Sequence, residues 1–515
     1  MKVDKTILTS LGLVVSLTAG LTVLANAQTA EADRSATLRY TQGAGPAGFD
    51  PPFAKNMFQE LGYELPIYDT LVQLDYTGKI NPGLATSWEF SDGGKTLTFK
   101  LRPGVKFIDG TNVDAAAVAK SMMRTKTDPE SKLAGLLKSF DSFEAKDPLT
   151  VVAKLNVADV NVLYTLVANP GMIVSAKALD DKVNLNEKPT GSGPYKLVTS
   201  GPQGASYERN DDYFNKDQNQ FAKVNMTLIV DTNARLNAIL TGQQDVGLFQ
   251  LDQTYPKVQE MVKSGKFQAP SFLQPNNYPI YLNTKIKPLD NPKVRQALNL
   301  AIDRDLINQG LQFGECQPSA QPFPPGVVGY DATLTPKKDV AKAKQLIQEA
   351  NVGPISFDML VNVSEPYASM GVAVKEQWSA IGVNVNIIPA NSTAIRPQFR
   401  AGNHGAMLHA LSAPSPDPAS LIDGALLTPD NPGGMSPEFV KAVNEAKTKA
   451  LGSPEREAAY KAISKMVYDD PPQVYICWAK AIMLGRKDLV GLDKTAYINA
   501  LSIPDFRNYS LPKGK

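Results

Sequence analysis

Apolar and polar residues alternate in short runs between residues 67 and 106, and turn residues separate these runs. In the run TLTFKL, Leu97, Phe99 and Leu101 fall on one side of an extended chain, and the residues between them fall on the other. A period of two is typical of strands with one buried and one solvated face. We therefore expect an antiparallel meander here, preceded by a first strand over residues 36–40.

The stretch LRPGVKFIDGTNVDAAAVAK, residues 101–120, joins this meander to a helix. Two turn signals, RPG and DG, enclose Val105 and Phe107, which we expect to continue a strand. Asp114 stands where a helix N-cap is expected. We interpret the segment as a structural junction, because it contains no nucleophile, metal ligand or phosphate-binding loop.

Amphipathic helices and β-like runs alternate in the second half of the chain. Residues 291–310 begin with Asn-Pro, a capping residue followed by a favourable first helical residue, and end at a glycine, which predicts one helix. Two further amphipathic stretches are each followed by a β-like run, at 339–350 with 355–361 and at 371–382 with 383–389. This alternation favours a second α/β lobe from about Asn276 to Trp478.

The first 27 residues have the features of a secretory signal peptide. Lys2 and Lys5 provide a positive start, residues 7–24 are mostly apolar, and the sequence ANA ending at Ala27 offers small residues for cleavage. Serine and threonine dilute the apolar run and no second hydrophobic stretch follows, which favours a cleaved signal over a membrane anchor. We expect cleavage after Ala27 and release into the periplasm. Because no cysteine lies at the cleavage site, we expect neither lipid attachment nor direct membrane insertion.

The composition and net charge of the chain limit the kinds of molecule that we expect it to bind. The chain has 515 residues, 43% of them hydrophobic, and a formal net charge of +2. Such a chain is typical of an ordinary globular protein of about two to four domains. No run of lysine and arginine could follow a phosphate backbone, which argues against nucleic acid as a partner.

Motifs of catalysis are incomplete in this sequence. GGKT lacks the earlier glycine of a phosphate-binding loop, because Glu89 occupies that position. GSGPY lacks the two glycines of a nucleophile elbow, so Ser192 is interpreted as a turn residue. The two histidines, His404 and His409, have a spacing that suits neither one helix face nor one strand face for joint metal binding. We expect no metal and no cofactor, and we interpret the chain as a binding protein.

The only two cysteines, Cys316 and Cys477, leave two possibilities open. In an oxidising compartment they are a possible disulfide, which would close a long loop and stabilise the fold by about 4–5 kcal/mol. Two separate buried thiols are the alternative. The sequence by itself does not bring the two residues together.

Four segments resemble successive landmarks of the bacterial extracellular solute-binding proteins of family 5. They are LATSWEFSDGGKTLTFKLRPGVKFIDG, PTGSGPYKL, NPKVRQALNLAIDRDLI and PDP, the last at 416–418. The segments appear in family order, and the resemblance covers roughly residues 36–492. This family includes dipeptide, oligopeptide and nickel receptors of ABC importers.

The resemblance implies an α/β, two-lobe periplasmic binding protein fold joined by hinge strands, with an extra subdomain inserted in lobe I. Lobe I would combine 28–70, 190–275 and 480–515, the subdomain would be 71–189, and lobe II would be 276–479. Family members trap a small-molecule solute by hinge closure and deliver it to the transmembrane permease subunits of an ABC importer. The resemblance thus implies a monomeric receptor that leaves its solute chemically unaltered.

Two other functional classes remain alternatives. An exported hydrolase or peptidase would use an unrecognised serine or metal site. An extracytoplasmic chaperone or a sensor subunit would bind without transport.

Candidate solute contacts follow from the segments that would border the cleft by resemblance. Arg396 or Arg400 could also bind a carboxylate, whereas Trp378 is expected in the core. The expected ligand-binding residues are Phe53, Tyr281, Asn283, Ser364, Glu365, Tyr367, Ser412 and Asp417.

The solute class is narrowed by one departure from the family pattern. In peptide-binding members, an aspartate three residues before the Asp-Pro landmark holds the peptide amino group, because a buried ammonium needs a paired carboxylate. Pro414 occupies that position here. This argues against simple peptides and leaves peptide-like, opine-like and glutathione-like compounds and oligosaccharides.

Overall fold

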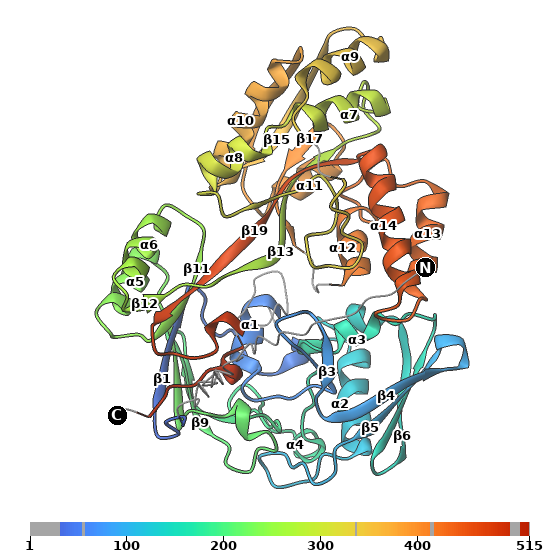
Figure 1. The fold of residues 1–515 in the computed structure, drawn as a ribbon. Coiled ribbons are helices and arrows are strands. Elements are labelled where there is room, and N and C mark those ends of the chain that lie inside the picture. The colour runs from blue at the N-terminus through green and yellow to red at the C-terminus, as the bar shows by residue number, and fades with distance from the viewer. Residues whose placement is uncertain (1–30, 54–56, 335–336, 413–416, 495–504, 514–515) are drawn as a thin grey trace, which may run out of the picture.

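The structure is a computed structural model that describes residues 31–53, 57–334, 337–412, 417–494 and 505–513. The signal-peptide prediction and Pro414 lie outside these residues. Figure 1 shows two lobes connected by two long strands, β13 and β19. The lower part, lobe I, holds the N-terminal elements, and the upper part, lobe II, holds helices α7–α14.

The two long strands, β13 (Ser271–Leu282) and β19 (Gln473–Arg486), are antiparallel neighbours in a 13-stranded sheet. In lobe I, β19 pairs with β11, and in lobe II, β13 pairs with β17. The register of β13 against β19 shifts on both sides of Asn277, so the ladder is irregular between the lobes. Such irregularities bend strands, which makes this point a natural hinge.

Each lobe contributes its own strands to the shared sheet, in the order β16-β15-β17-β13-β19-β11-β1-β10-β9-β8. The first strand, predicted at 36–40, is confirmed as β1. Lobe I holds β1 (Thr37–Gln42), β8 (Tyr195–Gly201), β9 (Gly204–Arg209), β10 (Lys223–Leu228), β11 (Val246–Gln250) and β12 (Phe267–Gln268). Lobe II holds β14 (Gln317–Pro318), β15 (Ile355–Asn362), β16 (Val383–Ala390), β17 (Ala406–Leu408) and β18 (Leu411–Ser412).

The segment predicted as one meander is divided between two sheets. Strands β2 and β3 form a two-stranded hairpin, whereas β4 and β5 join β7 and β6 of the following segment in a four-stranded antiparallel sheet, in the order β4-β5-β7-β6. Leu97 and Phe99 are fully buried, as their alternation predicts, and Asp114 caps the following helix by accepting a bond from Ala117 N at 2.8 Å. The expected strand through Val105 and Phe107 is reduced to one isolated bridge. The inserted part of lobe I, predicted at 71–189, contains β2 (Val72–Leu74), β3 (Ile80–Pro82), β4 (Ala85–Ser91), β5 (Thr96–Leu101), α2 (Ala115–Thr127), β6 (Phe140–Asp147), β7 (Thr150–Leu155), α3 (Val162–Thr165) and α4 (Ala176–Asp180).

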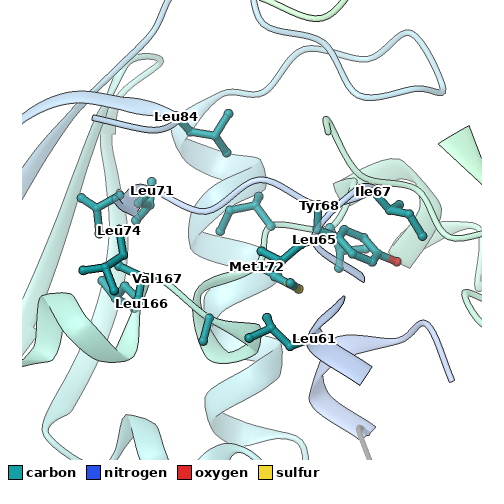
Figure 2. Packing of buried hydrophobic residues seen from close by; sticks show 14 of the residues in the cluster. Leu61, Leu65, Ile67, Tyr68, Leu71, Leu74, Leu84, Leu166, Val167 and Met172 are labelled. Atoms are coloured by element: carbon teal, nitrogen blue, oxygen red, sulfur yellow. The ribbon is translucent and has the colours of Figure 1, made fainter. Parts of the chain in front are cut away.

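One hydrophobic core joins this inserted part to the rest of lobe I. Leu38 of β1, Leu61 of α1 (Met57–Glu64), Phe99 of β5 and Met172 belong to the same buried cluster. Figure 2 shows its centre, where Leu61, Leu65 and Tyr68 lie beside Met172. Lobe II has other clusters, around α7–α10 and around α12–α14. Because the cores are separate, we expect each lobe to move as one body about β13 and β19.

Helix α7 corrects the prediction of one helix over 291–310. Asn291 caps it and Pro292 is its first residue, but Ile302 takes an extended backbone conformation and a second helix begins after Asp303. Asp303 accepts a bond from Leu306 N, so it caps the new helix. Helices and strands alternate from α9 to β17, as predicted, whereas α12, α13 and α14 follow one another without a strand between them. The helices of lobe II are α7 (Pro292–Ala301), α8 (Arg304–Leu311), α9 (Val340–Ala350), α10 (Tyr367–Ser379), α11 (Ile395–Arg400), α12 (Pro418–Ala425), α13 (Pro437–Lys447) and α14 (Pro454–Asp469).

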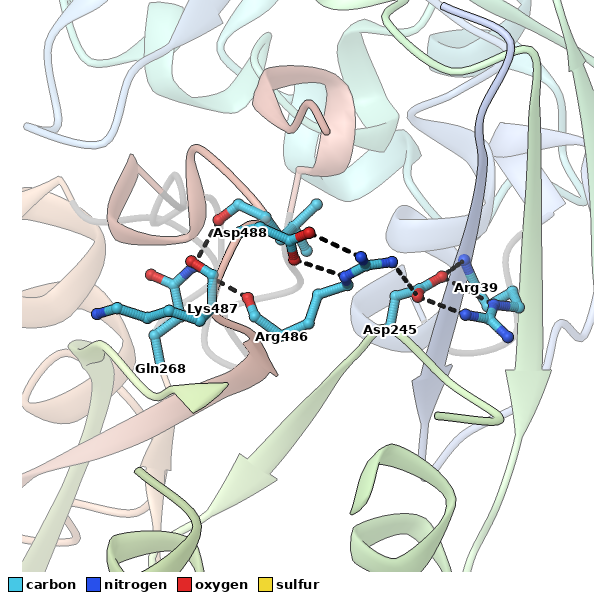
Figure 3. Close-up of polar contacts among 7 residues, drawn as sticks. Arg39, Asp245, Gln268, Arg486, Lys487 and Asp488 are labelled. Carbon is cyan, nitrogen blue, oxygen red and sulfur yellow. Dashed lines mark hydrogen bonds and ion pairs between the residues drawn. The ribbon is translucent and has the colours of Figure 1, made fainter. Parts of the chain in front are cut away.

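Polar contacts anchor the lobe I end of β19. The buried carboxylate of Asp245 accepts bonds from the Arg39 Nε and Nη2 at 2.9 and 2.6 Å, and Arg486 of β19 lies 3.4 Å from it. Figure 3 shows Asp245 between these two arginines, with Asp488 on the outer side of Arg486. Helices α5 (Thr232–Leu240) and α6 (Tyr255–Lys263) pack on the same strands. The end of β19 is therefore fixed to lobe I.

Cys316 and Cys477 form a disulfide, with Cα atoms 5.8 Å apart. The short strand β14 follows Cys316 and pairs with β19 at Trp478 and Cys477. The disulfide thus connects the loop before β14 to the hinge strand, which excludes the alternative of two separate thiols. In the described part of the chain, none of the helices combines the length and apolar character needed to cross a bilayer.

Candidate functional site

Two cavities lie where lobe I meets lobe II. The first, about 250 Å³, has Asn161 and Tyr164 of the inserted part on one side and Asp417 and Asp423 of lobe II on the other. The second, about 380 Å³, lies between the β2–β3 hairpin, Leu273 of β13 and the loop over 325–328. Tyr164 lines both cavities, so they are neighbours along one junction beside the hinge.

Arg456 of α14 crosses this junction. Its guanidinium lies 3.0 Å from the carboxylate of Asp417, donates a hydrogen bond to the side-chain oxygen of Asn161, and stacks 4.8 Å above the Tyr460 ring. Asp417 also caps α12 by accepting from Ser420 N. Burial raises the pKa of Asp417 to about 7, and the charge of Arg456 opposes this rise. Asp417 is therefore engaged by the protein itself.

The carboxyl ends of three parallel strands form the edge of lobe II nearest the hinge. Strand β15 is parallel to β16 and β17, and it ends at Asn362, while His409 directly follows β17. Open α/β sheets bind ligands at such edges. Strand β18, just beyond His409, pairs with Asn276 and Asn277 of the hinge strand. We call Asn276, Tyr278, Asn362, Tyr367 and His409 the hinge cluster.

Aromatic rings and amides hold the hinge cluster together. Tyr367 packs edge-on against Tyr278 at 5.4 Å between ring centroids, and its ring centre lies 6.0 Å from that of His409. The side chain of Asn276 is hydrogen bonded to Tyr367. Burial raises the pKa of both tyrosines, which therefore stay neutral. Burial, and then the charge of Arg396, lowers the pKa of His409 to about 4.

Several polar atoms of the hinge are buried without a hydrogen-bond partner among the described residues. They include both side-chain polar atoms of Asn277 and the indole nitrogen of Trp478, which face each other in the β13–β19 register. The Asn276 side-chain oxygen is a fourth such atom. Unsatisfied buried polar groups cost free energy, so a polar solute or water would stabilise this part of the molecule.

Arg396 and Arg400, both candidates for carboxylate binding, are paired with the buried Asp430. Arg396 also donates to the Ala410 carbonyl at 2.6 Å and lies 5.5 Å above the ring of Tyr281. Both guanidinium groups therefore have a carboxylate partner inside lobe II, although they share this one carboxylate.

The expected ligand-binding residues fall into two groups. The structure places Ser364 and Glu365 on the exposed turn before α10, and Tyr367 in the hinge cluster. Ser412 contributes its backbone to β18, opposite Asn276; its side chain is outside the described residues.

The other expected residues lie apart from the hinge cluster. Phe53 belongs to lobe I, where the Arg124 guanidinium stacks 4.9 Å from its ring. Tyr281 is fully buried beneath Arg396, and the Asn283 amide donates to the carbonyls of Gly402 and His404. Trp378 is fully buried, as predicted. Solute contact by these residues and by Asp417 stays a prediction.

The sequence patterns did not predict several residues that the structure places in the hinge cluster and at the junction of the lobes. His409 was considered only as a metal ligand, and Asn362, Asn161 and Arg456 carried no motif at all. A signal existed for Asn362 and His409, because each directly follows a β-like run of the predicted parallel lobe. Within the described residues, no group of three or more histidine, cysteine or acidic side chains could hold a metal ion.

Residues 79–432 match the family described as bacterial extracellular solute-binding proteins, family 5, middle region. The chain belongs to this family. Heme-binding protein A of Haemophilus influenzae is 27% identical over 501 residues, which cover 87% of this chain and 89% of that protein. Di/tripeptide-binding protein 1 of Pseudomonas aeruginosa is 26% identical over 421 residues, covering 75% and 78%.

A solved structure shares the fold of this family 5 protein. HbpA2 from Haemophilus parasuis superposes with a TM-score of 0.83 at 21% identity, covering 92% of this chain and all of that one. The expected family and two-lobe fold are thereby confirmed. The protein is a solute-binding receptor of the kind that serves ABC importers, and nothing in these similarities favours the exported hydrolase.

Proposed function

We propose that this family 5 protein is a monomeric periplasmic receptor that encloses a small, peptide-like solute between its lobes and passes it unaltered to an ABC importer permease. The observation that carries the proposal is the hinge: two strands connect two separately packed lobes, and cavities lie at their junction. A solute that contacts both lobes would stabilise the closed arrangement by its higher affinity for that arrangement.

The walls of the junction favour a neutral, amide-rich solute. Arg396 is paired with Asp430, which it shares with Arg400, and Arg456 is paired with Asp417, so neither Arg396 nor Arg456 is an unpaired cation. The hinge cluster, which lines neither cavity, adds amides, tyrosines and a neutral histidine near the hinge. Cavities of about 250 and 380 Å³ suit small molecules rather than long chains. Peptide-like, opine-like and glutathione-like compounds fit this chemistry better than oligosaccharides, which lack amide groups in their simple forms.

The proposal also includes export and the contacts made by the solute. Residues 1–27 would direct secretion and be removed after Ala27, without lipid attachment. Ser364, Glu365, Tyr367 and Ser412 would contact the solute from lobe II, and Phe53 would contact it from lobe I.

Native mass spectrometry of the full, non-denatured protein tests this function. We expect a bound small molecule in the mass spectrum. In thermal unfolding, a peptide-like compound at a hundredfold excess over its dissociation constant should raise the free energy of unfolding by about 2.7 kcal/mol. Turnover of the bound compound, or of a chromogenic ester, would contradict the proposal. So would a protein that binds unfolded chains but no small solute.

A further inference from the structure

The amide of Asn362 has an orientation that its backbone neighbour determines. Its Oδ1 accepts a hydrogen bond from Ser364 N at 3.0 Å. A backbone N–H can only donate, so this atom must be the oxygen and the other must be the nitrogen. That nitrogen lies 3.1 Å from Ser392 Oγ and 3.0 Å from His409 Nδ1.

The orientation of Asn362 determines the tautomer of His409. An amide nitrogen can only donate, so Nδ1 of His409 must accept, and the imidazole proton lies on Nε2. A protonated, cationic ring would place a second proton on Nδ1, facing the Asn362 donor. The ring is therefore neutral, and it presents one N–H donor at a known atom.

The Nε2–H group of His409 has no hydrogen-bond partner among the described residues. The side chain is half-buried, and the ring of Tyr367 lies beside it. The charged groups that act on it are Arg396 and Asp430, which pair with each other. The two tyrosines of the cluster are neutral. A fixed, neutral donor of this kind is complementary to a carbonyl or carboxylate oxygen.

We propose that His409 Nε2–H donates a hydrogen bond to an amide carbonyl oxygen of the solute, and that Asn362 is the positioning residue that keeps the proton on Nε2. This inference rests on the proposed function, because it adds the hinge cluster, whose residues line neither of the two cavities, to the surface that would contact the solute. It also assigns a specificity rule: a solute must offer an acceptor oxygen to lobe II at the end of β17. A solute group that could only donate would face the His409 donor and be rejected.

Nitrogen-15 NMR of the full protein tests the tautomer without any solute. The chain has only two histidines, so the variant His404→Gln assigns the spectrum. Between pH 5.5 and 8 we expect an unprotonated Nδ1 and a protonated Nε2 for His409, with no titration. A proton on Nδ1, or a cationic ring at pH 6, would overturn the inference. In Asn362→Asp, the carboxylate should attract a proton to Nδ1 and raise the pKa of the ring.

Calorimetric titration with reduced glutathione and with S-methylglutathione tests the contact. We expect His409→Leu to weaken binding about 3- to 10-fold, as the loss of one neutral hydrogen bond does. His409→Gln keeps a donor and should recover part of the affinity, and His404→Gln should bind as the wild type does. The wild-type dissociation constant should stay flat from pH 5.5 to 8, whereas Asn362→Asp should lose affinity as its histidine deprotonates with rising pH.

The possible failures are distinguishable. If either compound binds and His409→Leu retains full affinity, the His409 contact is wrong and the receptor function stands. If neither compound binds, the peptide-like solute class is wrong, and the contact to an amide carbonyl is rejected with it. The NMR result is independent of both outcomes.

Discussion

The guanidinium of Arg456 in lobe II donates a hydrogen bond to the side-chain oxygen of Asn161 in lobe I, across 295 positions of sequence. The two residues belong to bodies with separate cores, joined by β13 and β19 (Figure 1). On the opposite side of these strands, Tyr255 of α6 donates to Glu315 Oε1 at 2.7 Å. A rotation about the hinge would change both distances, so both contacts depend on how the lobes are arranged.

Replacing Asn161 should weaken solute binding by loosening the closed arrangement. Arg456 would keep its pair with Asp417, so the fold of lobe II should be retained. We expect Asn161→Ala to raise the dissociation constant by about 10- to 150-fold, since hydrogen bonds to charged groups contribute about 1.5–3 kcal/mol. Isothermal titration and small-angle scattering measure affinity and closure. Asn237→Ala, at an exposed position of α5, is the control, and an equal loss there would contradict the role of Asn161.

Removing Asp245 should destabilise lobe I. Its buried carboxylate lies between Arg39 and Arg486 (Figure 3), and Asp245→Ala would leave both guanidinium groups without it. The two arginine side chains are 41% and 42% exposed and would stay solvated, so the expected cost is that of lost hydrogen bonds to a charged group, about 1.5–3 kcal/mol. Asp488, which is exposed on the outer side of Arg486, provides the matched control, and Asp488→Ala should cost under about 1 kcal/mol. Urea denaturation compares the two, and equal losses would show that burial of Asp245 is unimportant.

The pH dependence of stability should report the buried state of His409. Its pKa is lowered from 6.5 to about 4 in the folded protein, so the unfolded chain binds more protons between these values. Stability should therefore fall as pH decreases from about 6.5 to 4. His409→Gln should remove this part of the decrease in a series of thermal unfolding curves. If the wild type and the variant decrease in parallel, the histidine is not held neutral.

Reduction of the disulfide should lower stability. Cys316 and Cys477 are separated by 161 positions, and constraining a loop of this length contributes about 4–5 kcal/mol on the chain-entropy view. The double variant Cys316→Ser and Cys477→Ser should melt at a lower temperature than the oxidised protein. The wild type with a reductant should match it. A reductant that further destabilises the double variant would show an effect unrelated to these cysteines.

The local pattern of apolar and polar residues was sufficient to predict several helices and strands of the fold. The alternation around Leu97 and Phe99 predicted a strand with one buried face, and the capping role of Asp114 followed from its place before an apolar helix face. These features depend on neighbours within a few residues along the chain, so the local sequence is sufficient to predict them. The split after α7 was missed because the apolar pattern of Leu298, Ile302 and Leu306 continues across it, and only the backbone conformation shows that Asp303 caps a new helix.

The sequence by itself determined the first strand, the strands around Leu97 and Phe99, the helices that became α2, α7, α9 and α10 and, through successive landmarks, the resemblance to family 5. Only the tertiary structure decided that Cys316 meets Cys477, that Arg456 reaches Asn161, and that Asn362 orients His409. The physical reason is the sequence separation of the contacts involved, because helix and strand patterns arise from contacts between near neighbours in the chain. The site instead arises where separately packed segments meet, and the packing of whole lobes about β13 and β19 sets those distances.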